Sequence, residues 1–524
     1  MMPPPGPPPM PPGAQARFAP ALTVGPPVES PRGGQFAWLQ WPWIVVLVFL
    51  PLAILALAEE RDRAGLILAY INVAIIGTAI IYFIKQHNFA AMVPVLFIGY
   101  LFFCWPAATI YMGLFSPENR YVMIDETYRR CLDGNVRVQL AAMVHVLCYL
   151  LMIFLLAPRS GPVGDFAQRD RAGTVLGVLA AVGAIFSTGL HVVGQMSSSA
   201  VIGYLGIGAF IYLNGFPFVV GALFPRVPIA VRVALIGFLC CTAVFYLVGG
   251  GRTWAILPFL LLTLGAIFYS AYKQRTRMMI AAALLIGMPI IIVAGETTQI
   301  LLGSKGWERF DERAAALKEN WRGNLAEGST LGRTFSRTFS TGGHSLITLT
   351  PDYYDYVPFV AGDFAQELIT TIFVPGRLYG ARYYSWTGQL KRYGFRITEK
   401  TSVELSFVGS LWMIGGWLPV ILGSLYVGLI HAIAMRWIHR AAQYSPYKGL
   451  FYLSMIAYSV FWASNLDVIT HTRMLLLAGI AGWLVWHIVI LPIIGDVRPR
   501  RAPRGFPVRL ATPTGRPAPG AALR

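Results

Sequence analysis

The residues best suited to chemistry stand where apolar and polar stretches of the sequence meet, and the first group is a glycine-rich run at 249–253. Gly250 and Gly251 lack a Cβ atom, so their backbone N–H groups can approach a ligand closely. The planar guanidinium of Arg252 suits the bidentate geometry of a phosphate or diphosphate. The run therefore indicates an anion site at the rim of a membrane. A tight interhelical turn with an arginine that reaches toward the headgroups is the competing interpretation.

Glu404 is the second candidate, because it stands where a long polar segment meets an apolar stretch. A carboxylate at the centre of a membrane helix costs about 3 kcal/mol, and less at the rim, so such an acid often faces a cavity or a partner. The alternative is an acid that caps the following helix, whose dipole favours negative charge at the N-terminus. His344 could act as a base near neutral pH, although a single loop histidine is more often inert.

The same polar segment mixes arginines with aromatic residues. Aromatic faces can stack on sugar rings and guanidinium groups can bind phosphates, so the mixture would suit a glycolipid diphosphate. Aromatic residues are also ordinary anchors at a membrane surface, which leaves that interpretation open for each of them. The candidates for binding are Arg377, Arg382, Tyr356 and Tyr379.

The other histidines and the basic residues indicate no further site. His145, His431 and His487 fall in apolar stretches without matching acids, which favours a role in helix packing. The sequence has no HExxH, CxxC or paired-histidine spacing, so we predict no protein-held transition metal and no cofactor. Every Lys and Arg falls in a loop, in a tail or at the boundary of a predicted span, so we expect no cation inside the membrane core.

These candidates must be positioned by membrane helices. Hydrophobic residues make up 56% of the 524 residues and charged residues only 13%, which a single soluble core could not accommodate. A helix needs about 20 apolar residues to span the hydrocarbon core, and lipid offers the backbone no other partner. We therefore predict an all-α membrane bundle of about twelve transmembrane helices. The predicted spans are 43–58, 65–84, 91–113, 138–156, 173–190, 199–222, 230–248, 253–272, 278–295, 405–435, 449–463 and 474–494.

The distribution of Lys and Arg predicts the orientation of the bundle. With the N-terminus inside, the cytoplasmic loops carry the excess of basic residues that is typical of inner-membrane proteins. The basic C-terminal tail then also lies inside, where anionic lipid attracts it, so the net charge of +18 indicates lipid contact and not nucleic acid. The predicted order is a disordered Pro-rich cytoplasmic tail (1–42), nine spans (43–295), a large periplasmic loop (296–403), three spans (404–494) and a basic cytoplasmic tail (495–524).

Three segments carry a resemblance to a known family. They are GGRTWAIL at 250–257, the end of the polar segment at 350–377 with TPD and FVPGR, and TSVE at 401–404, which leads into a glycine-rich helix. These segments resemble the Wzy-type oligosaccharide repeat-unit polymerases, the O-antigen polymerase-like membrane proteins. The family tends to have arginine directly after the proline, whereas Gly376 intervenes before Arg377 here.

The resemblance implies a metal-independent glycosyltransferase of a bacterial inner membrane, active in O-antigen or exopolysaccharide biosynthesis. Such an enzyme polymerises undecaprenyl-diphosphate-linked oligosaccharides on the outer face. With the residues above it suggests that Arg252 and Arg377 hold the donor diphosphate, while Glu404, or failing that His344, takes the proton from the acceptor hydroxyl. The expected partners are the lipid-linked oligosaccharide, membrane lipids, a chain-length regulator and a flippase, with no nucleic acid.

Two related enzymes and one other class of protein stay open. Residues 60–62, with the sequence ERD, resemble the acid-x-acid pattern of transferases that add one sugar from a polyprenyl phosphate, although the loop is short. An O-antigen ligase would share the architecture. A transporter without catalysis usually carries its site near the membrane midplane, and the sequence predicts no ionisable pair in the helical core.

Overall fold

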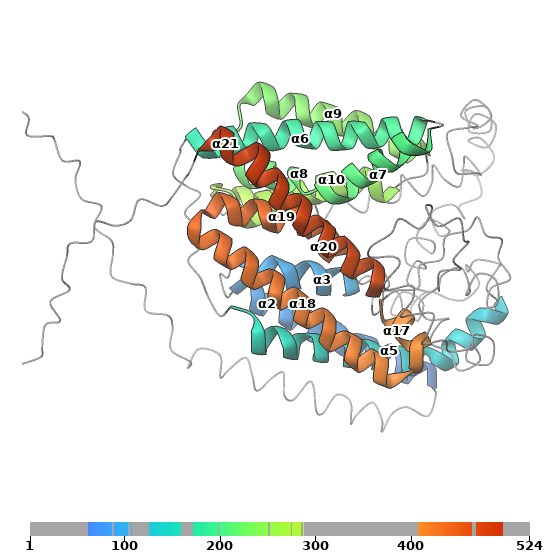
Figure 1. Ribbon diagram of the computed structural model, residues 1–524. Coiled ribbons are helices and arrows are strands. Elements are labelled where there is room, and N and C mark those ends of the chain that lie inside the picture. The colour runs from blue at the N-terminus through green and yellow to red at the C-terminus, as the bar shows by residue number, and fades with distance from the viewer. Residues whose placement is uncertain are drawn as a thin grey trace, which may run out of the picture. The chain divides into compact units, whose positions relative to one another are not determined.

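The computed structural model describes residues 61–85, 89–102, 106, 125–158, 171–197, 199–249, 252–273, 275–284, 287, 407–463 and 468–495 (Figure 1). The regular elements in these ranges are helices. In chain order they are α2 (Arg61–Lys85), η1 (Phe89–Ala91), α3 (Met92–Phe102), α5 (Asp125–Leu156), α6 (Arg171–Met196), α7 (Ala200–Leu213), α8 (Phe216–Leu223), η5 (Phe224–Arg226), α9 (Ile229–Gly249), α10 (Arg252–Tyr269), α17 (Phe407–Gly415), α18 (Trp417–Tyr444), α19 (Pro446–Trp462), α20 (Val468–Val485), η9 (Trp486–Ile490) and α21 (Leu491–Ile494).

Seven helices in the described part of the chain are long and apolar enough to cross a membrane. They are Ile67–Ile84, Val136–Leu156, Arg171–Met196, Val201–Arg226, Ile229–Leu247, Trp417–Tyr444 and Val468–Ile494. The prediction of an all-helical chain with helices of membrane-crossing length is therefore confirmed, whereas the count of twelve spans stays a prediction. The predicted periplasmic loop at 296–403 and nearly all of both predicted tails fall outside the described residues.

Helix α9 shows why these helices suit a lipid environment. Three apolar side chains on it, Ile229, Val233 and Val244, are 72%, 65% and 62% exposed. Cys240 and Cys241 are exposed on the same helix. In water a continuous apolar surface of this kind would drive association with other molecules. In a bilayer it costs nothing, because the surrounding lipid tails are equally apolar.

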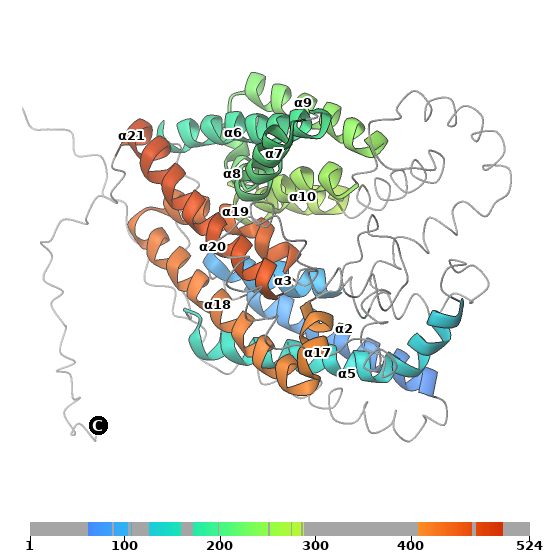
Figure 2. The ribbon, with the colours of Figure 1, turned by 45° about the vertical axis from the view of Figure 1, so that its right-hand side comes forward.

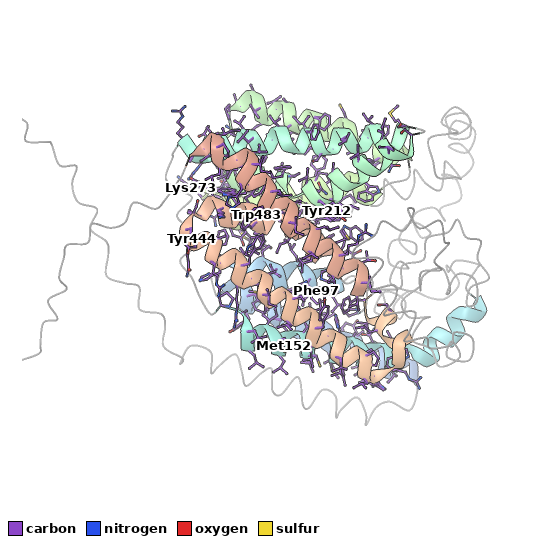
Figure 3. All side chains as sticks on the ribbon, viewed as in Figure 1. Phe97, Met152, Tyr212, Lys273, Tyr444 and Trp483 are labelled. Atoms are coloured by element: carbon purple, nitrogen blue, oxygen red, sulfur yellow. The ribbon has the colours of Figure 1, made fainter. Side chains whose placement is uncertain are left out.

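Glycines let several helix pairs approach closely. A Cβ atom added to Gly221 on α8 would lie 1.8 Å from the carbonyl oxygen of Leu262 on α10. A Cβ atom added to Gly428 on α18 would lie 2.7 Å from Cβ of Met152 on α5, in the contact between these two helices (Figure 3). Membrane helices pack through small residues in this way because burial from water does not drive their association.

The predicted span at 199–222 is divided into α7 and α8, which differs from the single helix that the apolar run indicates. The division falls at Gly215, where an added Cβ atom would lie 2.1 Å from the carbonyl oxygen of Ser454 on α19. Pro217 follows in the first turn of α8 and has no N–H group to continue the helix. Backbone contact with α19 and the missing donor together end the first helix.

The predicted span at 405–435 is also divided, into α17 and α18 (Figure 2). Gly416 separates the two helices and has a φ of 73°. Residues with a Cβ atom rarely adopt this conformation, whereas glycine adopts it readily. The long apolar run therefore holds a fixed break immediately after α17, and α17 is the helix that follows Glu404 in the sequence.

Candidate functional site

Most of the residues predicted to form the site fall outside the described residues. They are Gly250, Gly251, His344, Tyr356, Arg377, Tyr379, Arg382 and Glu404. Arg252 is the first residue of α10, and its side chain is also outside the description. The gathering of the arginines and the acid in one pocket therefore stays a prediction. What the structure describes is the set of helices from which these residues extend.

Trp254, two residues after Arg252, packs into a buried aromatic cluster. The centroid of its ring lies 4.9 Å from that of His191 on α6 and 4.8 Å from that of Phe210 on α7. The rings of His191 and Phe210 are 4.5 Å apart. The first turn of α10, which begins at Arg252, is therefore packed against both α6 and α7.

His191 also joins a line of hydrogen bonds across this cluster. Its Nδ1 lies 2.6 Å from the hydroxyl oxygen of Tyr246 on α9, and its Nε2 lies 3.2 Å from the amide nitrogen of Gln195. The amide nitrogen of Gln195 is a donor, so Nε2 of His191 accepts. The proton of the neutral imidazole then resides on Nδ1 and is donated to Tyr246. His191 is thus satisfied on both nitrogens, although it is fully buried.

A second cluster lies where α3, α5, α17, α18 and α20 meet, and it contains three fully buried histidines: His145, His431 and His471. The ring of Phe97 (Figure 3) lies 5.5 Å from His145 and 5.2 Å from His431. The ring of Phe407 lies 5.4 Å from His145 and 6.2 Å from His471. With the 5.1 Å between the rings of His431 and His471, the five rings form a closed circle. We call these five residues the histidine ring cluster.

Hydrogen bonds give the cluster two possible proton arrangements. The Nε2 atoms of His431 and His471 lie 3.0 Å apart, and Nδ1 of His431 lies 3.2 Å from the hydroxyl oxygen of Tyr149. Two neutral imidazoles can share only one proton between their Nε2 atoms. When His431 holds it, Tyr149 donates to His431; when His471 holds it, His431 donates to Tyr149. The two bonds in the line from Tyr149 to His471 are therefore satisfied in either arrangement.

His145 is held in one tautomer by its neighbour. Its Nδ1 lies 2.6 Å from Oγ of Ser424, and the Ser424 hydroxyl donates its single proton to the carbonyl oxygen of Val420 at 2.5 Å. His145 must therefore donate through Nδ1, which leaves Nε2 as an acceptor. Within the described residues this buried Nε2 has no hydrogen-bond partner, which is uncommon for a buried polar atom.

The structure bears on two expectations about the histidines of the helical core. His145 and His431 take part in helix packing, as predicted, whereas His487 contacts Trp483 in the preceding turn of the same helical stretch. The core was expected to hold no ionisable pair, yet His431 and His471 are in direct contact. The expectation failed because α20 begins at Val468, six residues before the predicted span at 474–494, so His471 is inside the bundle.

Arg473, which the sequence places at the boundary of a predicted span, falls inside a helix for the same reason. It lies within α20, in the candidate span Val468–Ile494, and its side chain is half-buried. A side-chain hydrogen bond joins it to Tyr212 on α7. The neighbouring Thr472 has its hydroxyl oxygen 3.0 Å from that of Tyr426 on α18. Three consecutive polar residues, 471–473, therefore attach α20 to α18 and α7.

Helix α7 connects the two clusters. Phe210 contacts Trp254 next to the start of α10, and Tyr212, two residues later, contacts Arg473 on α20. Contacts therefore connect Trp254, near the start of α10, through α7 and α20 to the histidine ring cluster, which includes Phe407. The sequence carried a signal for this site in the polar run HTR at 471–473, which opens an apolar stretch.

Comparisons with known proteins add no relative, because no family model, no curated protein and no solved structure matches the chain. In the described ranges, no group of three or more His, Cys, Asp or Glu side chains could hold a metal ion. The polar groups that the described residues bring together inside the bundle are thus the histidines of the histidine ring cluster and the contact of Arg473 with Tyr212.

Proposed function

We propose that this chain is a glycosyltransferase that polymerises polyprenyl-diphosphate-linked oligosaccharide repeat units at the outer face of a bacterial inner membrane. The resemblance at 250–257, 350–377 and 401–404 supplies the reaction class. In that reaction the acceptor hydroxyl oxygen bonds to the anomeric carbon of the donor sugar, and the bond from that carbon to the diphosphate breaks. The hydroxyl proton goes to a base, and the lipid diphosphate leaves.

In this proposal Arg252 and Arg377 bind the donor diphosphate and stabilise the negative charge that grows on it as the glycosidic bond breaks. Glu404, or failing that His344, accepts the proton of the acceptor hydroxyl. Residues Gly250 and Gly251 would bring backbone N–H groups to the same phosphates. The long segment at 296–403 would hold both sugar chains in register, with sugar contacts from Tyr356, Tyr379 and Arg382.

The observation that carries the proposal is the continuous line of contacts between two distant helix starts. Trp254, two residues after Arg252, contacts Phe210 on α7, and Tyr212 on α7 bonds to Arg473 on α20. His471 on α20 contacts Phe407, three residues after Glu404 in the sequence. A shared framework of α7 and α20 supports the idea that the two predicted motifs serve one site.

The glycolipid profile of a strain without this chain tests the reaction class. A polymerase predicts that single lipid-linked repeat units accumulate. A truncated unit would instead indicate a transferase of one sugar, and free polymer on its lipid carrier would indicate a ligase. Ladders formed by the purified protein from isolated lipid-linked units would complete the test.

The two arginines are tested by returning variants to the same strain. Arg252→Ala and Arg377→Ala, present at normal levels, should each reduce polymer formation about 10²-fold or more, because a positioned donor to the developing charge is lost. Arg440→Ala is the matched control, since Arg440 is an exposed arginine near the C-terminal end of α18. Full-length polymer from both variants would overturn the assignment.

A second candidate function is proton-coupled transport, and the contact between His431 and His471 favours it. Ionisable groups inside a membrane bundle often mark proton relays, and this pair has two proton arrangements. The purified chain in liposomes with a pH gradient would then move a solute or protons without forming product. His471→Phe should abolish that flux, whereas ladder formation without any flux would exclude this candidate.

A further inference from the structure

We propose that Arg473 binds a diphosphate group of the lipid carrier from inside the helical bundle. This inference rests on the proposed function for the identity of the carrier, and it adds a cation to the predicted pair of Arg252 and Arg377. The ligand chemistry is that of a phosphate ester, and we assign it to a lipid headgroup because Arg473 lies within a candidate membrane span.

The place of Arg473 inside a candidate membrane span favours an anionic partner. It is five residues beyond Val468, the first residue of α20, which corresponds to about 7.5 Å along the helix axis. A cation within a membrane helix costs about 3 kcal/mol on insertion scales and is almost always paired. Helices α6 to α10 and α17 to α20 contain no Asp or Glu. The neighbouring helices therefore offer Arg473 no carboxylate.

The contact with Tyr212 directs the guanidinium toward the bundle. Arg473 is half-buried and hydrogen-bonded to this tyrosine on α7, so its guanidinium lies beside α7. A guanidinium has five N–H donors in a planar fork, and one hydroxyl satisfies only a small part of them. The remaining donors match the oxygens of a phosphate, which arginine binds through parallel hydrogen bonds.

The position of Arg473 fits the path of the proposed donor. It follows His471, which belongs to the histidine ring cluster, and its partner Tyr212 is two residues from Phe210, which contacts Trp254. A diphosphate at Arg473 would thus lie between the helix that begins with Arg252 and the helix that follows Glu404. We infer that Arg473 holds the lipid diphosphate on the bundle side.

Binding of undecaprenyl diphosphate to the full chain in nanodiscs tests this inference. Arg473→Gln keeps a donor for Tyr212 but removes the charge, and it should weaken binding about ten- to a hundredfold, as expected for the loss of hydrogen bonds to a charged group. Arg473→Ala should give the same loss. Arg440→Ala is the matched control and should bind as the unchanged chain does. Unchanged binding by a folded Arg473→Gln variant would overturn the inference.

Two further arms separate the possible partners. Inorganic pyrophosphate should compete only weakly with the lipid, and equal affinity for pyrophosphate alone would overturn the assignment to a lipid headgroup.

The acid that precedes Arg473 most closely in the sequence is Asp467, which lies outside the described residues. Asp467→Asn should leave lipid binding unchanged. A loss of binding with Asp467→Asn as large as that with Arg473→Gln would identify a structural ion pair and overturn the proposal.

The outcome for Arg473 is distinct from that of the proposed function. If Arg473→Gln weakens lipid binding but a strain without the chain accumulates no single repeat units, the anion site stands and the polymerase assignment fails. If single units accumulate and Arg473→Gln restores full polymer with unchanged lipid binding, the polymerase stands and this inference fails.

Discussion

His431 and His471 meet with their Nε2 atoms 3.0 Å apart, although forty positions separate them in the chain. Both side chains are fully buried. The contact joins α18 to α20, and the ring of Phe97 on α3 lies 5.2 Å from that of His431. A polar contact at such a depth raises the cost of removing only one partner, because the other then keeps a buried polar atom without a bond.

The histidine pair should therefore show strong coupling in unfolding experiments. His471→Phe should destabilise the purified protein by about 1–3 kcal/mol, since His431 loses its Nε2 partner. The double variant His431→Phe/His471→Phe should be destabilised by less than the sum of the single effects. Thermal unfolding in detergent measures this, with His487→Phe as a control at a partly exposed histidine. Additive effects would contradict direct coupling.

The contact between α8 and α10 should be intolerant of any added volume. A Cβ atom on Gly265 would lie 2.1 Å from the carbonyl oxygen of Phe218, so Gly265→Ala should destabilise the fold by about 1–3 kcal/mol or more. Gly237→Ala is the matched control, because nothing lies within 4 Å of the added atom. That variant should be neutral or more stable, since alanine is the better helix former. Equal melting temperatures for the two variants would refute the close approach.

Cysteine labelling should reveal the orientation of the helices. Cys240 and Cys241 are exposed on α9, and lipid should shield them from a charged maleimide in intact membranes. Cys131 lies between the predicted spans at 91–113 and 138–156, which an N-terminus inside would place outside, so it should react in a chain whose other cysteines are serine. Tyr444 is 72% exposed at the end of α18, so Tyr444→Cys should react only after the membrane is opened. Reaction of Tyr444→Cys from outside would reverse the predicted topology.

Separate variants of the two candidate bases should distinguish their roles. Glu404→Gln should reduce polymer formation about 10²-fold or more, as is typical when a general base is lost. His344→Gln should have little effect if Glu404 is the base. The measurement is polymer length and amount in the strain without the chain, with protein levels matched. Full activity of Glu404→Gln together with loss in His344→Gln would transfer the role to the histidine.

The helical class and most of the helix positions could be predicted because apolar runs of sufficient length have only one solution in lipid. The predicted span at 138–156, for example, corresponds to the candidate span Val136–Leu156. The break at Gly215 could not be predicted, because it depends on the approach of Ser454 from a distant helix. Gly416 was visible as a glycine, but only its φ of 73° distinguishes a break from a tolerated helical glycine.

The sequence indicated the candidate motif residues but not the contacts between the buried histidines. His145, His431 and His471 come from three helices, and no spacing in the sequence relates them. They come together only through the packing of their helices in the folded chain. The sequence places Arg473 next to the predicted span at 474–494 and not inside it, because a charged residue lowers the apparent hydropathy of the helix start. The motif residues around Arg252 and Glu404, by contrast, were visible as types and spacing, and their mutual distance stays a prediction.

Phe407 closes the circle of rings, and it is also the first described residue after the long polar segment. A displacement of the preceding chain that carries this ring with it has to open the circle between His145 and His471. Any movement that reaches Phe407 therefore alters the packing around the buried histidines.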